Sequence, residues 1–294
     1  MKKENVSKRK AAVLFVCLTL LLTWVFQFLP LILKLNVEET SISSFDFASV
    51  FFIIGGMMPS LIGVIFAFVF FKKENVKDFF ARCFIPTKKS FLAILIGLAV
   101  VCFETFVAQM IAKALGGSAL GFEGLKMILH NPLMFFYFLF WGLMSGPLSE
   151  EFGWRGFLTD VAINKKNIFK GSLIIGVIWG LWHLPLFFYP AQIQYEWAHT
   201  NFMLVICFVL MCMSNSLVYS AVYVISQRRV FSIFFLHMFE NIILTGAMIY
   251  PFSDVYKTVV NPVSIILDVV FFLIITRTKL YKDSLEKMPE AESE

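Results

Sequence analysis

The sequence predicts an all-α, polytopic integral membrane protein with about eight transmembrane helices and an active site buried in the helix bundle. Hydrophobic residues make up 59% of the 294 residues and charged residues only 15%, whereas soluble domains carry about 25% charged residues. Apolar runs of about 18 or more residues recur along the chain, and each is long enough to cross a bilayer. Ionisable side chains interrupt some of these runs, which is costly in a membrane and indicates a functional site.

The number and direction of the spans follow from the apolar runs and the basic residues. With a cytoplasmic N-terminus, 20 of the 25 Lys and Arg residues fall inside, 4 fall outside and Arg155 lies within the membrane. This asymmetry fits the positive-inside rule and accounts for the net charge of +5 without a nucleic-acid partner. The first run is too long for a signal peptide. The predicted spans are 11–33, 45–71, 90–113, 132–160, 168–189, 202–226, 231–250 and 258–276.

Three ionisable residues lie close together in the fourth predicted span, namely Glu150, Glu151 and Arg155. On a helix, Glu151 and Arg155 share a face and can pair. Glu150 points about a third of a turn away and is free to face another group. The preceding Gly146-Pro147 is expected to kink the helix and to open space near the carboxylates.

Two further polar sets occupy apolar surroundings. His183 follows two tryptophans in the fifth predicted span, and His237 and Asn241 lie four residues apart in the seventh. At about 1.5 Å per residue, Glu151 and His183 each lie about 20 Å from the loop that joins their spans, and the third set lies about 12–18 Å from its own loop. We therefore expect three helices to bring these groups to one pocket that opens toward the cytoplasm.

This combination of side chains fits the hydrolysis of a peptide bond by activated water. A carboxylate in an apolar pocket can act as a general base. A histidine can share in activating water or can ligate a metal ion. A histidine and an amide on one helix face can donate hydrogen bonds to a developing oxyanion. No serine or cysteine lies in a nucleophile motif, which favours direct attack by water over an acyl-enzyme.

Structural interpretations compete with the catalytic one. A lone histidine in a membrane can bridge helices by hydrogen bonds, and Glu151 with Arg155 can form a structural ion pair. The conjunction of all three sets favours catalysis. Two other functions remain open: a non-catalytic immunity or scaffold protein, and a small proton-coupled transporter. We expect three aromatic residues near these motifs to serve packing, namely Trp179, Trp182 and Phe239. Helix–helix hydrogen bonding explains four single polar residues, namely Glu104, Gln109, Asn215 and Asp268. The role of Glu240 stays ambiguous.

The order of these motifs resembles the CPBP family of intramembrane proteases. That family includes the type II CAAX prenyl endopeptidases and bacteriocin-processing or immunity proteins. The motifs are EExxxR at Glu150–Arg155, an aromatic four residues before His183, and HxxxN at His237–Asn241. The resemblance covers roughly residues 132–250. One departure is Trp179, where the family pattern usually has Phe.

The resemblance implies which residues perform the reaction. The first glutamate, Glu150, is expected to activate water together with His183, and the HxxxN pair is expected to form the oxyanion site. Family members have been described both as metalloproteases and as glutamate-dependent enzymes. Zinc on Glu150, His183 and His237 is thus possible, but HExxH is absent and we favour a metal-independent reaction. The candidate catalytic residues are Glu150, Glu151, His183, His237 and Asn241, supported by Arg155.

Domain organisation and partners follow from the same interpretation. We expect a multi-pass protein of a bacterial cell membrane, with cytoplasmic termini, that acts on a membrane-associated peptide or protein. Its substrates would be of the CAAX type or bacteriocin and leader peptides. The predicted divisions are an N-terminal segment (1–10), N-terminal helices (11–131), a protease core (132–250), a last helix (251–281) and a cytoplasmic tail without fixed structure (282–294).

Overall fold

The fold is a bundle of helices. The computed structural model describes residues 8–40, 46–117, 123–243 and 254–289, and every regular element within them is helical. Six helices in this part of the chain are long and apolar enough to cross a membrane, which confirms the predicted all-α, polytopic class. They are α1 (Lys8–Ile32), α2 (Phe47–Phe70), α4 (Lys88–Ala114), α9 (Ile168–Trp182) with its continuation η2 (Leu184–Phe188), α11 (Phe202–Ile225) and α13 (Asp254–Arg277).

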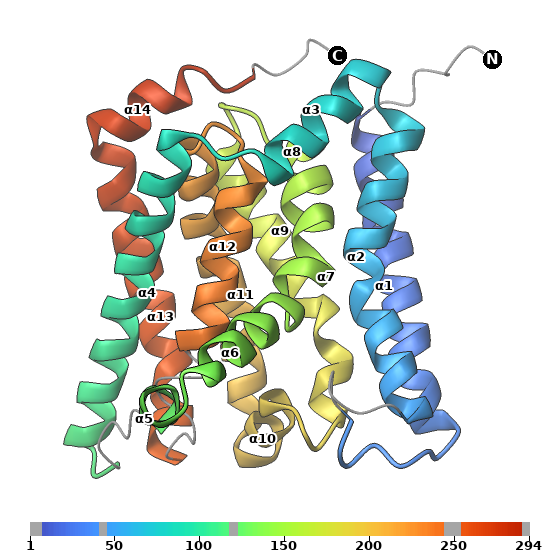
Figure 1. Cartoon of the computed structure of the whole chain (residues 1–294), viewed down its shortest axis with the longest axis vertical. Coiled ribbons are helices and arrows are strands. Elements are labelled where there is room, and N and C mark those ends of the chain that lie inside the picture. The colour runs from blue at the N-terminus through green and yellow to red at the C-terminus, as the bar shows by residue number, and fades with distance from the viewer. Residues whose placement is uncertain (1–7, 41–45, 118–122, 244–253, 290–294) are drawn as a thin grey trace.

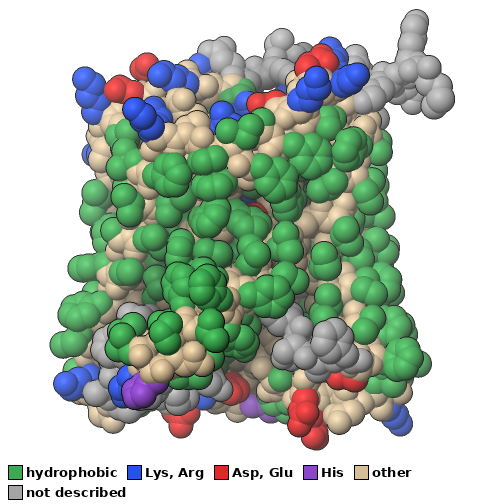
Figure 2. Space-filling model, viewed as in Figure 1, with side chains coloured by type: hydrophobic (Ala, Val, Ile, Leu, Met, Phe, Trp, Pro, Cys, Tyr) green, Lys and Arg blue, Asp and Glu red, His purple; other side chains and the backbone are tan. Residues whose placement is uncertain are grey.

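The two ends of the bundle differ in charge. The short helices α3 (Lys73–Phe84) and α14 (Lys279–Leu285) lie at one end, and α5 (Glu123–His130) and α10 (Ile193–Thr200) lie at the other (Figure 1). Lys and Arg side chains are concentrated at the first end, which we call the basic end, and an apolar flank separates the two ends (Figure 2). Exposed side chains such as Phe68, Leu95 and Phe140 belong to the apolar surface. A surface of this kind suits contact with lipid.

The fourth predicted span is built from pieces instead of one helix. It comprises α6 (Leu133–Met144), α7 (Pro147–Glu151), the π-helical turn η1 (Phe152–Leu158) and α8 (Thr159–Ala162). The break falls at Gly146-Pro147, as expected for a residue pair that cannot continue a helix. In η1, the backbone N–H of Thr159 donates to the carbonyl of Trp154, five residues earlier. Such π-turns often mark functional sites.

Close backbone contact holds this segmented span in place. A Cβ atom on Gly153 would lie only 2.1 Å from the carbonyl oxygen of Pro59, so no other residue fits there without moving a helix. On the facing helix, a Cβ on Gly63 would lie 2.6 Å from the Cα of Gly153. These small residues let η1 pack directly against α2. The motif at residues 150–155 is therefore anchored to the first half of the chain.

Two other sequence expectations are refined by the structure. The helix α12 (Val230–Asn241) forms the first part of the seventh predicted span, whereas 244–250 lies outside the described residues. The expectation of a tail without fixed structure is wrong for its first part, because α14 continues to Leu285. Tyr281 and Met288 are buried in the apolar core, and this burial orders the segment.

The helix α11 occupies the centre of the bundle. Every residue from Ser214 to Ile225 is buried, so this half of the helix is covered on all sides. A helix with that pattern belongs to the interior of a bundle. It packs against α9, α13 and α4, and it presents Tyr219 and Tyr223 to the polar groups of the interior.

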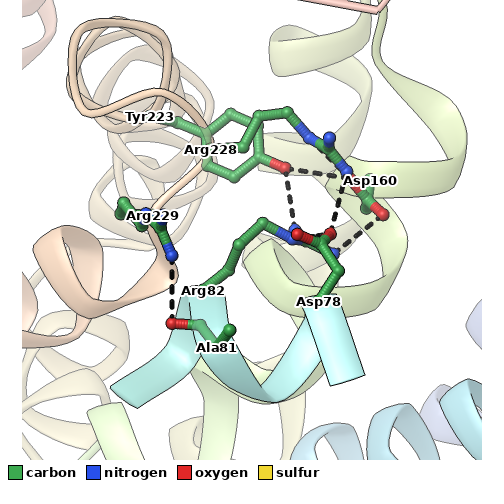
Figure 3. Close-up of polar contacts among 7 residues, drawn as sticks. All are labelled: Asp78, Ala81, Arg82, Asp160, Tyr223, Arg228 and Arg229. Carbon is green, nitrogen blue, oxygen red and sulfur yellow. Dashed lines mark hydrogen bonds and ion pairs between the residues drawn. The ribbon is translucent and has the colours of Figure 1, made fainter. Parts of the chain in front are cut away.

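A network of charges joins α3 to the segmented span at the basic end (Figure 3). We call Asp78, Arg82, Asp160, Tyr223 and Arg228 the Asp160 cluster. Arg82 donates from Nε to Asp78 (2.8 Å) and from Nη2 to Asp160 (3.0 Å), while Arg228 Nε donates to Asp160 (3.1 Å). Burial tends to lower the pKa of the Arg82 guanidinium, but the Asp160 carboxylate outweighs it and the pKa is raised. The charge of Arg82 is therefore fixed at every ordinary pH.

Candidate active site

Glu151 and Arg155 form the pair that their spacing predicts. Nη1 of Arg155 donates to Oε1 of Glu151 over 2.9 Å, and both side chains are buried. The guanidinium carbon also lies 4.5 Å from the ring centroids of both Trp179 and Tyr219. Cation–π contact on two sides compensates part of the lost hydration of the guanidinium. Arg155 is thus held by an ion pair and two aromatic rings.

Glu151 also contacts a histidine from another helix. Nδ1 of His237 lies 2.7 Å from Oε1 of Glu151, so a single carboxylate oxygen joins Arg155 of η1 to His237 of α12. The remaining oxygen, Oε2 of Glu151, and Nη2 of Arg155 are buried and make no hydrogen bond to the described residues. Polar atoms at membrane depth need a protein partner or bound water. The ion pair therefore leaves two polar atoms of the site unsatisfied by the described residues.

Glu150 faces away from this pair, toward α9. The indole Nε1 of Trp179 donates to Oε2 of Glu150 over 2.5 Å. Trp179 packs in the apolar core as expected, and in addition its N–H group bonds to the candidate base. A phenylalanine, which the family pattern usually has there, could not donate this bond. The sequence does contain a sign of this bond, because tryptophan has a ring N–H donor and phenylalanine has none.

His183 belongs to the same group through Trp179. Its Nδ1 lies 2.7 Å from the backbone carbonyl oxygen of Trp179, and its ring packs against Trp182 with 4.6 Å between centroids. Within the described residues, no hydrogen bond joins His183 directly to Glu150. The expected sharing of one water by these two groups therefore stays a prediction. With Nδ1 engaged, Nε2 is the ring nitrogen that remains for chemistry.

Gly146 lets the backbone of the break approach the third motif closely. A Cβ atom on Gly146 would lie 2.6 Å from Nε2 of His237 and 3.0 Å from Nδ2 of Asn241. The break after α6 thus packs against the two groups assigned to the oxyanion, and the expected open space near the carboxylates stays a prediction. Nδ2 of Asn241 also donates to Oγ of Ser145 over 3.1 Å, which orients the amide. The role of Ser145 could not be found from the motif spacing, because it depends on the fold of the break.

The structure brings all six candidate residues to one region of the interior. Glu150, Glu151 and Arg155 come from α7 and η1, His183 from the end of α9, and His237 and Asn241 from α12. The ring of Trp179 lies at their centre, 5.6 Å from the His183 ring and 5.9 Å from the His237 ring. Spacing along separate helices did predict this meeting. Tyr219 was missed, and a tyrosine in the middle of an apolar helix was the available sign.

The metal set considered for zinc does not fit this arrangement. Within the described residues, no three His, Cys, Asp or Glu side chains are placed to hold a metal ion together. Nδ1 of each histidine faces a protein oxygen, of Trp179 or of Glu151, so only Nε2 of each ring would remain for a metal ion. We therefore derive no step through a metal ion.

The candidate residues lie in the part of the chain that is similar to known proteins. A family model described as type II CAAX prenyl endopeptidase Rce1-like matches residues 132–243. Residues 132–243 are thus similar to an Rce1-like domain. This part of the chain contains all six candidate residues, and the match confirms the family resemblance of the motifs.

A curated relative supports the same family. CAAX prenyl protease 2 of Methanococcus maripaludis is 38% identical to this chain over 68 residues. The match covers 21% of this chain and 25% of the relative, so the chain matches about a quarter of that protein's length. The helices α1 to α4 and α13 lie outside the matched residues.

Proposed function

We propose that this protein is an intramembrane endopeptidase that hydrolyses a peptide bond of a membrane-associated substrate. One observation carries the proposal: Glu150, His183, His237 and Asn241 converge from three segments around Trp179, inside the part of the chain that is similar to an Rce1-like domain. A purely structural role would leave unexplained why carboxylates, histidines and an amide meet inside an apolar helix bundle beside a break in a helix. Substrates of the CAAX type or bacteriocin and leader peptides both fit the proposal.

In this reaction Glu150 accepts a proton from a water molecule, which attacks the carbonyl carbon of the substrate peptide bond. Trp179 orients the carboxylate, and Nε2 of His183 helps to hold the water. The oxyanion receives hydrogen bonds from Nδ2 of Asn241 and from Nε2 of His237. Glu150 then returns the proton to the departing amine, so the carboxylate is regenerated and one water is consumed.

The role of His237 requires a definite protonation state. Its Nδ1 faces the Glu151 carboxylate and carries a proton there, so Nε2 can donate only when the ring is an imidazolium. In that state Arg155 and His237 are balanced by Glu150 and Glu151, two positive charges against two negative ones. A balanced group of four charges suits a buried site better than an unpaired charge. Glu151 thus acts as the residue that orients His237 as well as the partner of Arg155.

Single-turnover cleavage of a membrane-associated reporter peptide by purified protein in detergent tests the proposal. We expect Glu150→Gln, His183→Ala and His237→Ala each to abolish cleavage while the protein still folds. Asn241→Ala should retain more activity, because losing one oxyanion donor costs about a hundred- to a thousandfold. Melting curves of each variant separate chemistry from folding. Near wild-type cleavage by a folded Glu150→Gln protein would refute the mechanism and favour a scaffold or immunity role.

We also propose that the basic end faces the cytoplasm and that residues 132–243 act as a protease core within a bacterial membrane. The proposal rests on the concentration of Lys and Arg at that end, which the positive-inside rule places inside. Cysteines introduced into the segment 190–200, at the opposite end, should react with an impermeant thiol reagent only from outside intact cells. Labelling of that segment only from the cytoplasmic side would reverse the orientation.

A further inference from the structure

Two residues on one face of α11 hold the end of α12. Nδ2 of Asn215 donates to Oε1 of Glu240 over 2.6 Å, and the hydroxyl of Tyr219 donates to Oε2 of Glu240 over 2.5 Å. Asn215 and Tyr219 are four residues apart, so they lie on the same face of their helix. All three side chains are buried. Both oxygens of Glu240 are therefore bound by one neighbouring helix, which fixes the distance and the rotation of α12 relative to α11.

Glu240 lies beside the third motif on α12, three residues after His237 and one before Asn241. With 3.6 residues per turn, its side chain points about 60° away from His237 and about 100° away from Asn241. A rotation of α12 that broke the bonds of Glu240 would turn the two motif residues by the same angle. The beginning of α12 is held separately, because Nη1 of Arg229 donates to the carbonyl oxygen of Ala81 over 3.1 Å. The bonds of Glu240 thus act at the end of α12 that carries the oxyanion groups.

The ring of Tyr219 connects Glu240 to the charged groups of the proposed active site. Its centroid lies 4.5 Å from the guanidinium carbon of Arg155 and 6.0 Å from the ring centroid of His237. On another side, it lies 5.9 Å from the ring centroid of Trp179. The bond from the hydroxyl to Glu240 fixes the far end of this ring, and a buried tyrosine hydroxyl requires such a partner. The position of the ring, and with it the packing of Arg155 and His237, therefore depends on Glu240.

We propose that Glu240 and Tyr219 are positioning residues of this active site, an inference that rests on the function proposed above. Neither side chain takes part in the reaction itself. The bond between them keeps His237 and Asn241 directed at the oxyanion. Displacement of a catalytic group by about 1 Å can cost about a hundredfold in rate, so a smaller shift should cost about tenfold. The loss should fall on the cleavage step and not on substrate binding, because the oxyanion develops only in the transition state.

Tyr219→Phe tests the proposal directly, because it keeps the ring and removes only the hydroxyl. In full-length protein in detergent, the single-turnover rate at saturating reporter peptide should fall about tenfold, while the half-saturating peptide concentration stays at the wild-type value. Glu240→Ala should lose at least as much rate. Glu240→Gln should keep more of it, because the amide oxygen can still accept from Tyr219. Tyr219→Phe combined with Glu240→Ala should be no slower than Glu240→Ala alone, since both changes remove the same bond.

Ser214→Ala is the matched control on the same helix. Oγ of Ser214 donates to Oδ2 of Asp268 over 2.7 Å, and this buried bond joins α11 to α13, which carries no candidate catalytic residue. The variant should be less stable but should cleave at the wild-type rate per folded molecule. Equal rates per folded molecule for Tyr219→Phe and Ser214→Ala would overturn the proposal. Equal losses in Glu240→Gln and Glu240→Ala would overturn it as well, because the charge of Glu240 would then matter and not the position that it sets.

The NMR signal of the His237 ring gives a second measurement that does not depend on cleavage. In protein labelled with ¹³C-histidine, the Cε1–H signal of His237 is assigned by its loss in His237→Ala. This signal should shift in Tyr219→Phe and in Glu240→Ala, and should stay in place in Ser214→Ala. An unchanged signal in both of the first two variants would overturn the proposal. If wild type cleaves no peptide but the signal shifts as expected, the proposed function fails while the positioning of His237 by Tyr219 and Glu240 stands.

Discussion

The pair Glu151–Arg155 and the Asp160 cluster both consist of arginine–carboxylate ion pairs, but the two groups differ in their further partners. Both join arginine to a buried or half-buried carboxylate, and both connect the segmented span to another part of the fold. In the first, the carboxylate also reaches His237, and two buried polar atoms of the pair have no hydrogen-bond partner in the described residues. In the second, arginine groups and a tyrosine hydroxyl surround Asp160, and no histidine takes part.

This difference separates a site that can exchange protons from one that only holds helices together. Arginine stays charged at every ordinary pH, and the raised pKa of Arg82 and Arg228 strengthens that behaviour. A histidine beside two carboxylates can change its protonation state during a reaction. We therefore expect mutations in the first group to affect cleavage, and mutations in the Asp160 cluster to affect stability alone.

The largest combined effect is expected for Arg155→Ala. Removing the guanidinium breaks its buried ion pair with Glu151, and breaking a buried pair costs roughly 3–5 kcal/mol of stability. It also frees Glu151 to shift away from His237, so cleavage per folded molecule should fall as well. Chemical denaturation and cleavage should be measured on the same preparation. Full stability with no activity would instead place Arg155 in the chemistry itself.

A second test inserts one methyl group into the site. Gly146→Ala would bring a Cβ to 2.6 Å from Nε2 of His237, so the imidazole has to move. Displacement of a catalytic group by about 1 Å can cost about a hundredfold in rate, and we expect a loss of that order in the turnover rate. Gly56→Ala in α2 is the matched control, because its nearest non-local atom lies 3.8 Å from the added Cβ. Equal activity of the two variants would exclude a tightly packed third motif.

The sequence predicted those features that depend on spacing within one helix. Glu151 and Arg155 are four residues apart, which predicts their ion pair, and the break at Gly146-Pro147 follows from residue types alone. Helix depth also predicted that the three motifs meet. These features depend only on residue types and on distances along the sequence, so the sequence is sufficient to predict them.

Contacts between distant segments were not predictable in the same way. The bond from Trp179 to Glu150 joins residues 29 positions apart, and the contact of Arg82 with Asp160 joins residues 78 positions apart. Both depend on the rotation of each helix about its axis, which hydropathy does not determine. Unlike the break before α7, the π-helical turn η1 brings Gly153 close to Pro59 of α2. A single apolar run cannot reveal that contact.

The smallest effect, confined to stability, is expected for Asp160→Asn. The substitution removes the charge that Arg82 and Arg228 share, while the side chain keeps its size and can still accept hydrogen bonds. Because Arg228 is partly exposed, water can replace some of the lost contact, and we expect a loss of about 1–3 kcal/mol. Gln227 and Arg228 adopt left-handed backbone angles (φ of 60° and 66°) at the turn before α12, so weakening the bond from Arg228 to Asp160 should loosen this turn first.

Hydrogen exchange of the 226–230 amides should therefore increase in Asp160→Asn, whereas cleavage per folded molecule should stay at the wild-type rate. The exposed control Asp283→Asn should change neither quantity. A large fall in cleavage by folded Asp160→Asn would mean that the Asp160 cluster sets the position of α12 and His237, and the functional separation of the two charged groups would then be wrong.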